Sequence, residues 1–379
     1  MFFIFFLIFL LLMVIELFFS NIPKTVFNLN FLLITLLLSI RYGFGIDYFN
    51  YNYLFNAIPN VTSELFWTNQ VYGEFGFKLI IGVLKEFGFR FSGYIFIMTF
   101  IVMGLIYRFI IKYSDLKFTS LFIFYCMYLF TYVNSAIRQG LTLALFLGIL
   151  YPLLERKKYF SYVLLTILFS SFHVSILVVL VLPLIKFKFN KNSLLLSLLA
   201  SFLLLISFRL FNISKILGLI PFLSTKLVYL EVESINIFPI FTRCVTFFLI
   251  LYLLSLAKDK DLYNSRMVQY YMLGFLLFIC LSQYPTIASR FNVYFKAFEI
   301  IIIPALLYKF SKERRANIIT FILIVFFSFM WGKEVQSQIS RSNYNENINI
   351  FNYPFTTIFD KEKIFEYKNV QFLDNFDDY

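Results

Sequence analysis

The sequence predicts an all-α polytopic integral membrane protein. Of its 379 residues, 60% are hydrophobic and only 14% are charged, and the mean hydropathy is +0.81. A soluble domain carries roughly 45–50% apolar and about 25% charged residues, so a water-soluble fold of this composition would lack polar surface. A bilayer removes that requirement because lipid surrounds apolar side chains on every side. Long apolar runs also recur along the chain, separated by short basic connectors.

A helix needs about 20 apolar residues to cross a hydrocarbon core of roughly 30 Å. The runs that meet or approach this length are 1–20, 25–40, 93–111, 118–134, 139–154, 193–208, 239–257, 267–283, 289–308 and 316–331. The first run lacks the basic start and the small-residue cleavage site of a secretory signal, so we expect it to stay as a span. With the interrupted stretch 159–186 the chain has about twelve helical segments, and residues 1–331 form one transmembrane domain.

The basic connectors orient these segments, because Lys and Arg residues gather in cytoplasmic loops. Clusters at 156–158 and 186–191 flank the stretch 159–186. Both clusters are cytoplasmic if that stretch turns back as a short re-entrant pair near His173. A single long tilted helix, with its His bonded internally, is the alternative.

The same map places the longer polar segments on the outer side. These are the loops 41–92 and 209–238, together with a polar C-terminal tail at 332–379. Within the first loop, residues 77–89 have the apolar and charged faces of an interfacial helix.

Several classes of partner are excluded by composition. The net charge of +12 resides mostly in the connectors, so it gives no reason to expect a nucleic-acid partner. The three cysteines lie inside apolar runs, and His173 is the only histidine. No group of residues has the spacing of metal ligands, so we expect neither a metal nor a cofactor.

Polar residues at the outer ends of spans are the candidates for chemistry. Arg41 leaves the second apolar run and is followed by two glycines and Asp47. A guanidinium can hold an anionic group through paired hydrogen bonds, and Asp47 could orient Arg41 or accept hydrogen bonds from sugar hydroxyls. An Arg–Asp pair that anchors the helix end is the alternative.

Two further arginines, Arg138 and Arg290, open spans on the expected outer side, where the positive-inside rule gives no reason for them. Arg138, which precedes Gln139, needs an anionic partner. That partner is either a ligand phosphate or a carboxylate such as Glu74 or Asp47. Glu74 itself could be a site residue or a solvated loop carboxylate.

His173 sits at the polar break Ser170–Ser175. An imidazole titrates near neutral pH and can serve as a general base. Outward arginines could stabilise a diphosphate leaving group without a metal. We therefore predict that His173, Arg138 and Arg290 are catalytic and that Arg41, Asp47, Glu74 and Gln139 bind substrate.

Short motifs occur in a fixed order along residues 40–355: Arg41-x-Gly43-x-Gly45-x-Asp47-Tyr48, Glu74-Phe75-Gly76, Asn134-x-x-x-Arg138-Gln139, Arg156-Lys157-Lys158, Phe172-His173-x-Ser175, Ser289-Arg290 and Tyr353-Pro354-Phe355. In this order the chain resembles the EpsG family of exopolysaccharide and O-antigen polymerases, the Wzy-type enzymes. The chain departs from the resemblance at one motif. We expect Glu-Pro-Gly after Tyr72, and this chain has Glu74-Phe75-Gly76.

The resemblance implies a GT-C-like fold and a metal-independent glycosyltransferase. It implies that undecaprenyl-diphosphate-linked oligosaccharide repeat units are joined on the outer face of the bacterial inner (cytoplasmic) membrane, with release of a lipid diphosphate. A chain-length-regulating copolymerase is a possible partner. The resemblance also implies roles for the site residues. The outward arginines Arg41, Arg138 and Arg290 would contact the diphosphate. His173 would be the base or orient the acceptor, and Asp47 and Glu74 would lie on the sugar side.

Other functions remain open at this point. An O-antigen ligase or another lipid-linked sugar transferase would use similar residues. A flippase or transporter is less favoured, because no internal repeat is present and the polar residues gather at span ends. An acyltransferase would need a nucleophile beside His173, and only Ser170, Ser171 and Ser175 are near in the sequence.

Overall fold

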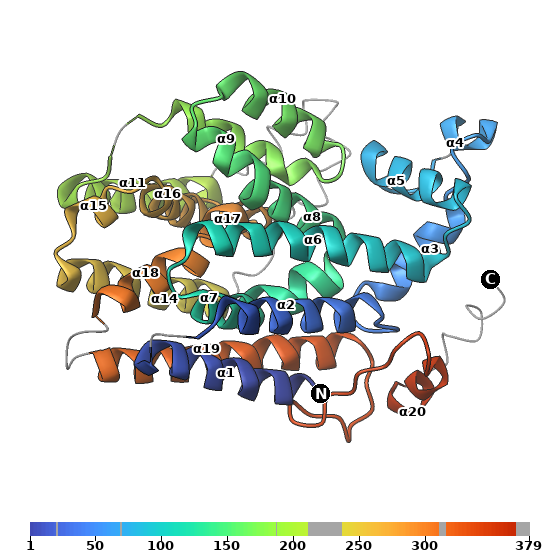
Figure 1. The fold of residues 1–379 in the computed structure, drawn as a ribbon. Coiled ribbons are helices and arrows are strands. Elements are labelled where there is room, and N and C mark those ends of the chain that lie inside the picture. The colour runs from blue at the N-terminus through green and yellow to red at the C-terminus, as the bar shows by residue number, and fades with distance from the viewer. Residues whose placement is uncertain (20–21, 69, 187, 211–236, 311–315, 369–379) are drawn as a thin grey trace. The chain divides into compact units, whose positions relative to one another are not determined.

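The computed structural model confirms the all-α polytopic architecture (Figure 1). It describes residues 1–19, 22–68, 70–186, 188–210, 237–310 and 316–368. Helices account for nearly all regular structure among these residues, and the only β contacts are two isolated bridges. The chain divides into two compact units: unit 1 comprises Met1–Val174 and Leu307–Tyr379, and unit 2 comprises Ser175–Leu306.

Five helices of the described chain are long and apolar enough to cross a membrane: α1 (Phe2–Phe19), α6 (Phe91–Tyr113), Ile137–Glu155, α14 (Ile237–Ala257) and α19 (Ala316–Arg341). Shorter apolar helices correspond to most other predicted runs: α2 (Lys24–Ser39), α10 (Tyr159–Ser170), η3 (Val174–Leu184), α11 (Lys191–Leu210) and α16 (Arg266–Cys280). Residues 77–89, expected to form an interfacial helix, largely coincide with α5 (Phe75–Glu86), and the interfacial position stays a prediction. Most of the predicted loop 209–238 lies outside the described residues.

Two predicted runs contain irregular helix. The run 118–134 consists of α7 (Lys117–Phe124) followed by the π-helical stretch η1 (Tyr125–Ser135). The run 139–154 combines α8 (Ile137–Leu145), η2 (Phe146–Leu150) and α9 (Tyr151–Glu155), with η2 also π-helical. Stretches of π-helix are uncommon and frequently accompany functional sites.

The predicted span 289–308 is not one continuous helix. The structure has α17 (Pro285–Lys296) and α18 (Glu299–Phe310), which meet at a bend of 43°. Pro304 lies inside α18, and a proline cannot donate the amide hydrogen bond that would join it to the residue four positions earlier. The helical ladder is therefore weakened close to the bend.

The predicted span 316–331 continues ten residues further, to Arg341. Polar residues do not end this helix because η1 supplies partners for them. Glu334 accepts a hydrogen bond from the Thr131 hydroxyl at 2.8 Å, and Gln338 accepts one from Ser135 at 3.0 Å. The first part of the expected polar tail is thus helix packed within unit 1.

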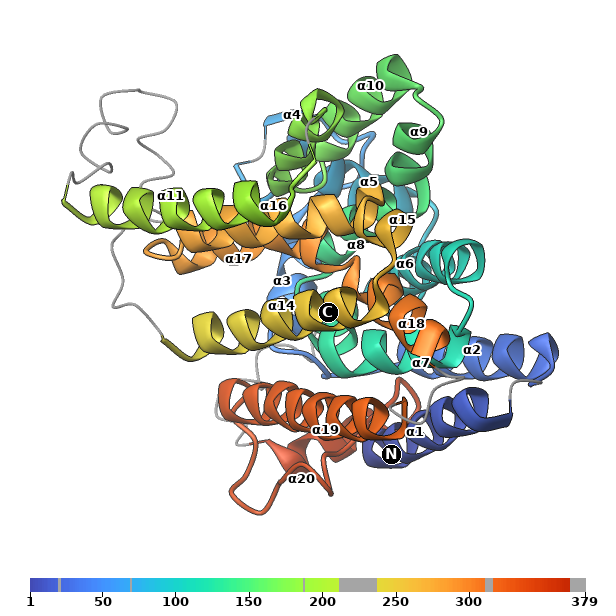
Figure 2. The same ribbon diagram turned by 90° about the vertical axis from the view of Figure 1, so that its left-hand side faces the viewer.

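Neighbouring helices of unit 1 run antiparallel where α1 packs on α7 and η1. At one end the Tyr125 hydroxyl donates to the Phe2 carbonyl at 2.7 Å. Toward the other end the Thr119 amide and hydroxyl donate to the Glu16 carboxylate at 2.8 and 3.0 Å. In both views of the ribbon α1 also lies beside α19 (Figures 1 and 2), and the Phe6 and Trp331 rings stack at 4.5 Å.

As a result, the segments that join these helices collect at two opposite ends of unit 1. Residues 40–48, 133–138 and 353–358 share one end, which we call the polar end. Tyr42 and Thr356 exchange hydrogen bonds of 2.9 and 2.5 Å there, and the Ile358 amide donates to the Ile40 carbonyl at 2.9 Å. The C-terminal segment is therefore bound to the segment after α2. The basic connectors at 112–117 and 156–158 lie at the opposite ends of the same helices.

Gly45 allows the closest backbone approach at the polar end. Its φ is +110°, and a Cβ there would overlap the Asn134 carbonyl. We predict that Gly45→Ala lowers stability by more than the roughly 1–3 kcal/mol expected of backbone strain alone. Thermal unfolding of the purified protein tests this.

Two other glycines are matched controls for Gly45→Ala. Gly88 has φ +76° with no atom within 4 Å of its Cβ position, and Gly104 has open space at ordinary helical φ. Gly88→Ala should lower the stability through backbone strain alone, because no atom overlaps the added Cβ. Gly104→Ala should leave the stability unchanged or raise it slightly. Equal melting temperatures for the Gly45 and Gly88 variants would contradict the assigned overlap.

Candidate functional site

Three of the predicted residues meet at one carboxylate in unit 1. Arg138 Nη1 lies 2.5 Å from Glu74 Oε2, and His173 Nδ1 lies 3.0 Å from Glu74 Oε1. Both carboxylate oxygens are thereby engaged, one by a guanidinium and one by an imidazole. The three side chains are largely buried, with exposures of 13%, 21% and 9% for Arg138, Glu74 and His173. We call these residues the Arg–Glu–His group.

Each member stands at the end of a helix, not inside one. Arg138 lies in the first turn of α8, and Glu74 is the N-cap residue of α5. His173 falls in the break between α10 and η3, which confirms the predicted interruption of the stretch 159–186. Helix ends place the polar side chains at the polar end without burying them in the apolar middle of a span.

Gly76 brings the α5 segment against the turn that carries His173. Its amide donates to the Ser171 carbonyl at 2.8 Å, and a Cβ at residue 76 would overlap the side chains of Ser171 and Phe172. A larger residue would force the two segments apart. The Glu74-Phe75-Gly76 motif therefore supplies both the carboxylate and the close contact that positions it beside the imidazole.

Aromatic rings surround the Arg138 guanidinium. Its central carbon lies 5.1 Å from the ring centroids of Tyr72 and Phe77 and 5.9 Å from that of Tyr51. A cation over an aromatic face is stabilised by the ring quadrupole, more strongly where water is excluded. The rings hold the guanidinium in place, and its buried Nε has no hydrogen-bond partner among the described residues.

The electrostatics of the group favour an ionised Glu74. Burial acts to raise the pKa of Glu74, but the hydrogen bond from His173 and the charge of Arg138 outweigh it and lower the pKa to about 2. The carboxylate is therefore charged at neutral pH and can only accept hydrogen bonds. His173 Nδ1 must then carry the proton in the bond to Glu74.

In the neutral imidazole of His173, a proton on Nδ1 leaves Nε2 with a lone pair that can accept a hydrogen bond. Nε2 is buried and has no hydrogen-bond partner in the described part of the chain. A carboxylate that holds the imidazole tautomer while the second nitrogen stays basic is the arrangement of a general base in a catalytic triad. The group can accept a proton from a hydroxyl placed at Nε2.

The depressed pKa of Glu74 makes a testable contribution to stability. Because the folded-state pKa of about 2 lies below the ordinary value of 4.5, the contribution is present above pH 4.5 and is lost as the pH falls toward 2. We expect the melting temperature of the wild type to exceed that of Glu74→Gln near neutral pH, and the difference between the two temperatures to shrink below pH 4.5. A difference that is constant over this range would show that ionisation of Glu74 does not stabilise the fold.

Arg41 is held differently from Arg138. Its side chain is 1% exposed and donates to the carbonyls of Leu38 and Val133 at 2.7 and 2.8 Å and to the Thr99 hydroxyl at 2.7 Å. It forms no ion pair with a described carboxylate, so the alternative of an Arg41–Asp47 pair is wrong. These neutral contacts join the ends of α2 and η1 to α6. Its role toward a diphosphate stays a prediction.

The remaining predicted residues are placed without a demonstrated role. Asp47 is the half-buried N-cap residue of α3 (Tyr48–Ala57), and Gln139 is buried in α8. Arg290 lies half-buried on α17 in unit 2. Their roles, like those of the other site residues, stay predictions.

Some residues of the site were not singled out in the sequence. Tyr51, Tyr72 and Phe77 gave no signal because aromatic residues make up 22% of this chain. The Glu334 contact to η1 was also missed, since the helix end was expected before it. Among the described residues, no group of three or more His, Cys, Asp and Glu side chains could hold a metal ion.

Fold and site together define a multi-pass helical membrane protein with a guanidinium–carboxylate–imidazole group at the polar end of one unit. The chain belongs to the EpsG family: the model of that family matches residues 24–355, which is most of the chain, and its members are Wzy-like polymerases. The resemblance noted in the sequence is thereby confirmed. Comparison with curated proteins and with solved structures returned no match.

Proposed function

We propose that this protein is a metal-independent glycosyltransferase that polymerises oligosaccharide repeat units carried on undecaprenyl diphosphate. Membership of the EpsG family supports polysaccharide polymerisation in general. The observation that carries the specific proposal is the Arg–Glu–His group, with an ionised Glu74 between Arg138 and His173. It combines a basic nitrogen for an acceptor hydroxyl with a cation for an anionic donor.

In the proposed step, a hydroxyl oxygen of the incoming repeat unit attacks the anomeric carbon at the reducing end of the growing chain. The bond between that carbon and the diphosphate oxygen breaks, and the lipid diphosphate leaves with the bonding electrons. His173 Nε2 takes the hydroxyl proton, and Glu74 stabilises the resulting imidazolium, as an orienting carboxylate does. The proton then passes to solvent or to the leaving diphosphate.

Arg138 is proposed to contact the diphosphate. One terminal nitrogen of the Arg138 guanidinium is paired with Glu74, and its Nε group has no described hydrogen-bond partner. A guanidinium fixed by surrounding rings needs no rearrangement when negative charge develops on the leaving group, and such preorganisation contributes strongly to catalysis. Arg41 and Arg290 are retained as further candidates on the diphosphate side.

We propose that the polar end of unit 1 faces the outer side of the bacterial cytoplasmic membrane. The basic connectors at 112–117 and 156–158 occupy the opposite ends of the helices, and basic loops favour the cytoplasm. This orientation would present the Arg–Glu–His group to lipid-linked repeat units on the outer leaflet. A cysteine introduced at exposed Glu64, labelled from outside in intact cells, tests it.

The proposed activity is tested with the purified full chain in detergent. Lipid-diphosphate-linked repeat units are supplied with EDTA, and the products are resolved by length. A ladder of longer chains with equimolar release of lipid diphosphate supports polymerisation. Transfer only to a different acceptor would indicate a ligase, and absence of any new glycosidic bond would remove the glycosyltransferase proposal.

The same question is asked in the host by deleting the gene and restoring it. Loss of the surface-polysaccharide ladder to single-repeat products, restored by the wild-type gene, is the expected result. Unchanged long chains in the deletion strain, with no second polymerase present, would contradict the proposal.

A further inference from the structure

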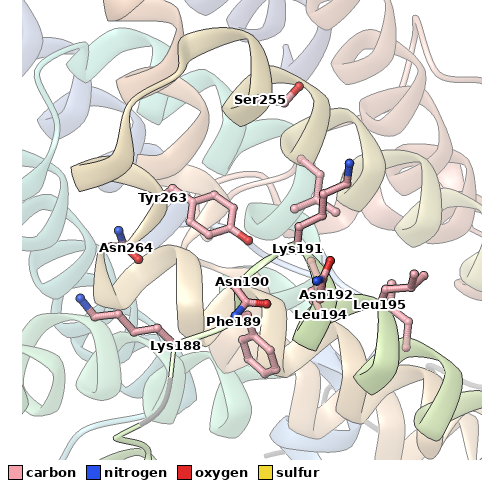
Figure 3. Close-up of a pocket in the computed structure, with 12 residues that line it drawn as sticks. Lys188, Phe189, Asn190, Lys191, Asn192, Leu194, Leu195, Ser255, Tyr263 and Asn264 are labelled. Carbon is pink, nitrogen blue, oxygen red and sulfur yellow. The ribbon is translucent and has the colours of Figure 1, made fainter.

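Unit 2 contains a pocket that the Arg–Glu–His chemistry does not use. It has a volume of about 840 Å³ and lies where the start of α11 faces the end of α14 and the connector that follows (Figure 3). Its mouth is polar and its wall is apolar: the lining residues are Lys188, Phe189, Asn190, Lys191, Asn192, Leu194, Leu195, Leu198, Leu251, Ser255, Tyr263 and Asn264. Such a division suits a ligand with a polar head and an apolar body.

The mouth of the pocket carries positive charge that is not paired with any described carboxylate. Lys188 and Lys191 are exposed, and neither forms an ion pair with a carboxylate in the described ranges. The Tyr263 hydroxyl makes no hydrogen bond to any residue in those ranges. Figure 3 shows this hydroxyl between the two lysines in the view, with the two ammonium groups pointing to opposite sides. A lysine ammonium and a tyrosine hydroxyl can each donate a hydrogen bond to a phosphate.

Hydrogen bonds fix the backbone around the mouth of the pocket. Gln269 of α16 is 5% exposed and joins both sides of the mouth. It accepts from the Phe189 amide at 2.6 Å and donates to the Tyr263 carbonyl at 2.9 Å. Asn190 and Ser193 also bond each other's backbone amides at 2.8 Å, which fixes the turn before α11. The lysines are thus attached to a fixed frame.

The apolar wall continues from this mouth along two helices. Leu194 and Leu198 lie on α11, and Leu251 lies on α14. Leu195 and Leu199 of α11 are more than half exposed, as expected of side chains that face acyl chains. An acyl chain can therefore follow the leucines while its phosphate stays at the lysines.

We propose that this pocket binds an anionic glycerophospholipid through its phosphate and one acyl chain. The positive charge of Lys188 and Lys191 disfavours a cationic choline headgroup and favours a net negative one. The basic residues near the mouth belong to connectors expected on the cytoplasmic side, where anionic lipids attract basic segments. None of the residues proposed for polymerisation lines this pocket, and binding can be measured without activity.

The test uses the full chain purified in detergent and native mass spectrometry. Phosphatidylglycerol is titrated in parallel with phosphatidylcholine of the same acyl chains, and inorganic phosphate is added as a competitor. We expect retention of phosphatidylglycerol, little retention of phosphatidylcholine and no displacement by phosphate. Equal retention of the two lipids would overturn the proposed headgroup recognition, and displacement by phosphate would indicate an anion site that needs no lipid.

Variants locate the binding in this pocket. Lys188→Ala combined with Lys191→Ala should weaken phosphatidylglycerol binding by about 30-fold, since each basic residue near an anionic headgroup contributes roughly 1 kcal/mol. Arg156→Ala with Lys158→Ala removes the same charge from an exposed connector in unit 1 and should leave binding unchanged. Equal losses in both double variants would show that net charge, not the pocket, retains the lipid.

The apolar wall is tested separately with Leu198→Trp, which fills the pocket and keeps both lysines. Reduced phosphatidylglycerol binding in this variant, with an unchanged elution volume on gel filtration, supports the acyl-chain position. Wild-type binding would place the acyl chain elsewhere and overturn the pocket assignment.

Discussion

Replacing Glu74 with glutamine is expected to abolish polymerisation almost as completely as removing the imidazole. Arg138 can only donate hydrogen bonds, so the carboxamide must turn its oxygen toward Arg138 Nη1, which lies 2.5 Å from one carboxylate oxygen. Its NH₂ group then faces His173 Nδ1, now 3.0 Å from the other oxygen. Nδ1 becomes the acceptor and the proton moves to Nε2, which can no longer act as a base.

The loss in rate expected for Glu74→Gln is about 10²–10⁴-fold, the range that general-base catalysis contributes. It should appear mainly in kcat, because the variant retains the shape of the site. Glu64→Gln is the matched control: Glu64 is exposed on α4 (Glu64–Thr68) in the same polar segment and makes no described side-chain contact. Full activity in Glu74→Gln would show that the carboxylate does not set the tautomer of His173.

His173→Asn should give a comparable loss for a different reason. The asparagine NH₂ group can occupy the position of Nδ1–H and keep the hydrogen bond to Glu74, so the pairing with Arg138 is preserved. It has no atom that replaces Nε2, the buried nitrogen left without a partner in the described structure. We expect a fall of about 10²–10⁴-fold in kcat with little change in KM.

The comparison with His173→Gln sharpens this result. A glutamine extends further and can place its carbonyl oxygen near the former Nε2, but an amide oxygen is too weakly basic to take a proton from a hydroxyl. Both variants should therefore show the fall of about 10²–10⁴-fold in kcat, and His173→Asn, which keeps the hydrogen bond to Glu74, should be as thermally stable as the wild type. Polymer of normal length from His173→Asn in reconstituted membranes would assign His173 a structural role only.

Burial within the membrane explains why so few polar contacts define the site. Helices with apolar side chains on all faces satisfy their backbone internally, so unit 1 needs few side-chain hydrogen bonds along its spans. The polar contacts instead gather where helices end, as at Arg41 and at the Arg–Glu–His group. A single substitution at such an end removes a partner for which the apolar surroundings offer no replacement.

Some site residues could be predicted from local pattern alone. Arg138 and His173 could be singled out because an ionisable side chain beside a long apolar run is costly without a partner or a function. Glu74 was one of two carboxylates considered for Arg138, and choosing between it and Asp47 was beyond the sequence. The contact depends on Gly76 meeting the turn at Ser171, which are separated by a large part of the chain. Such a long-range approach leaves no periodic pattern.

The amino-acid sequence was enough to predict an all-helical membrane protein of the EpsG family and the approximate position of most long apolar helices. It could do so because apolar runs of span length and ordered motifs are local properties. The partners of Arg41 and Arg138, the bend between α17 and α18, and the extension of α19 to Arg341 became evident only from the packed structure. Those features depend on which polar groups meet across the packed helices, since a buried charge is stable only beside its partner.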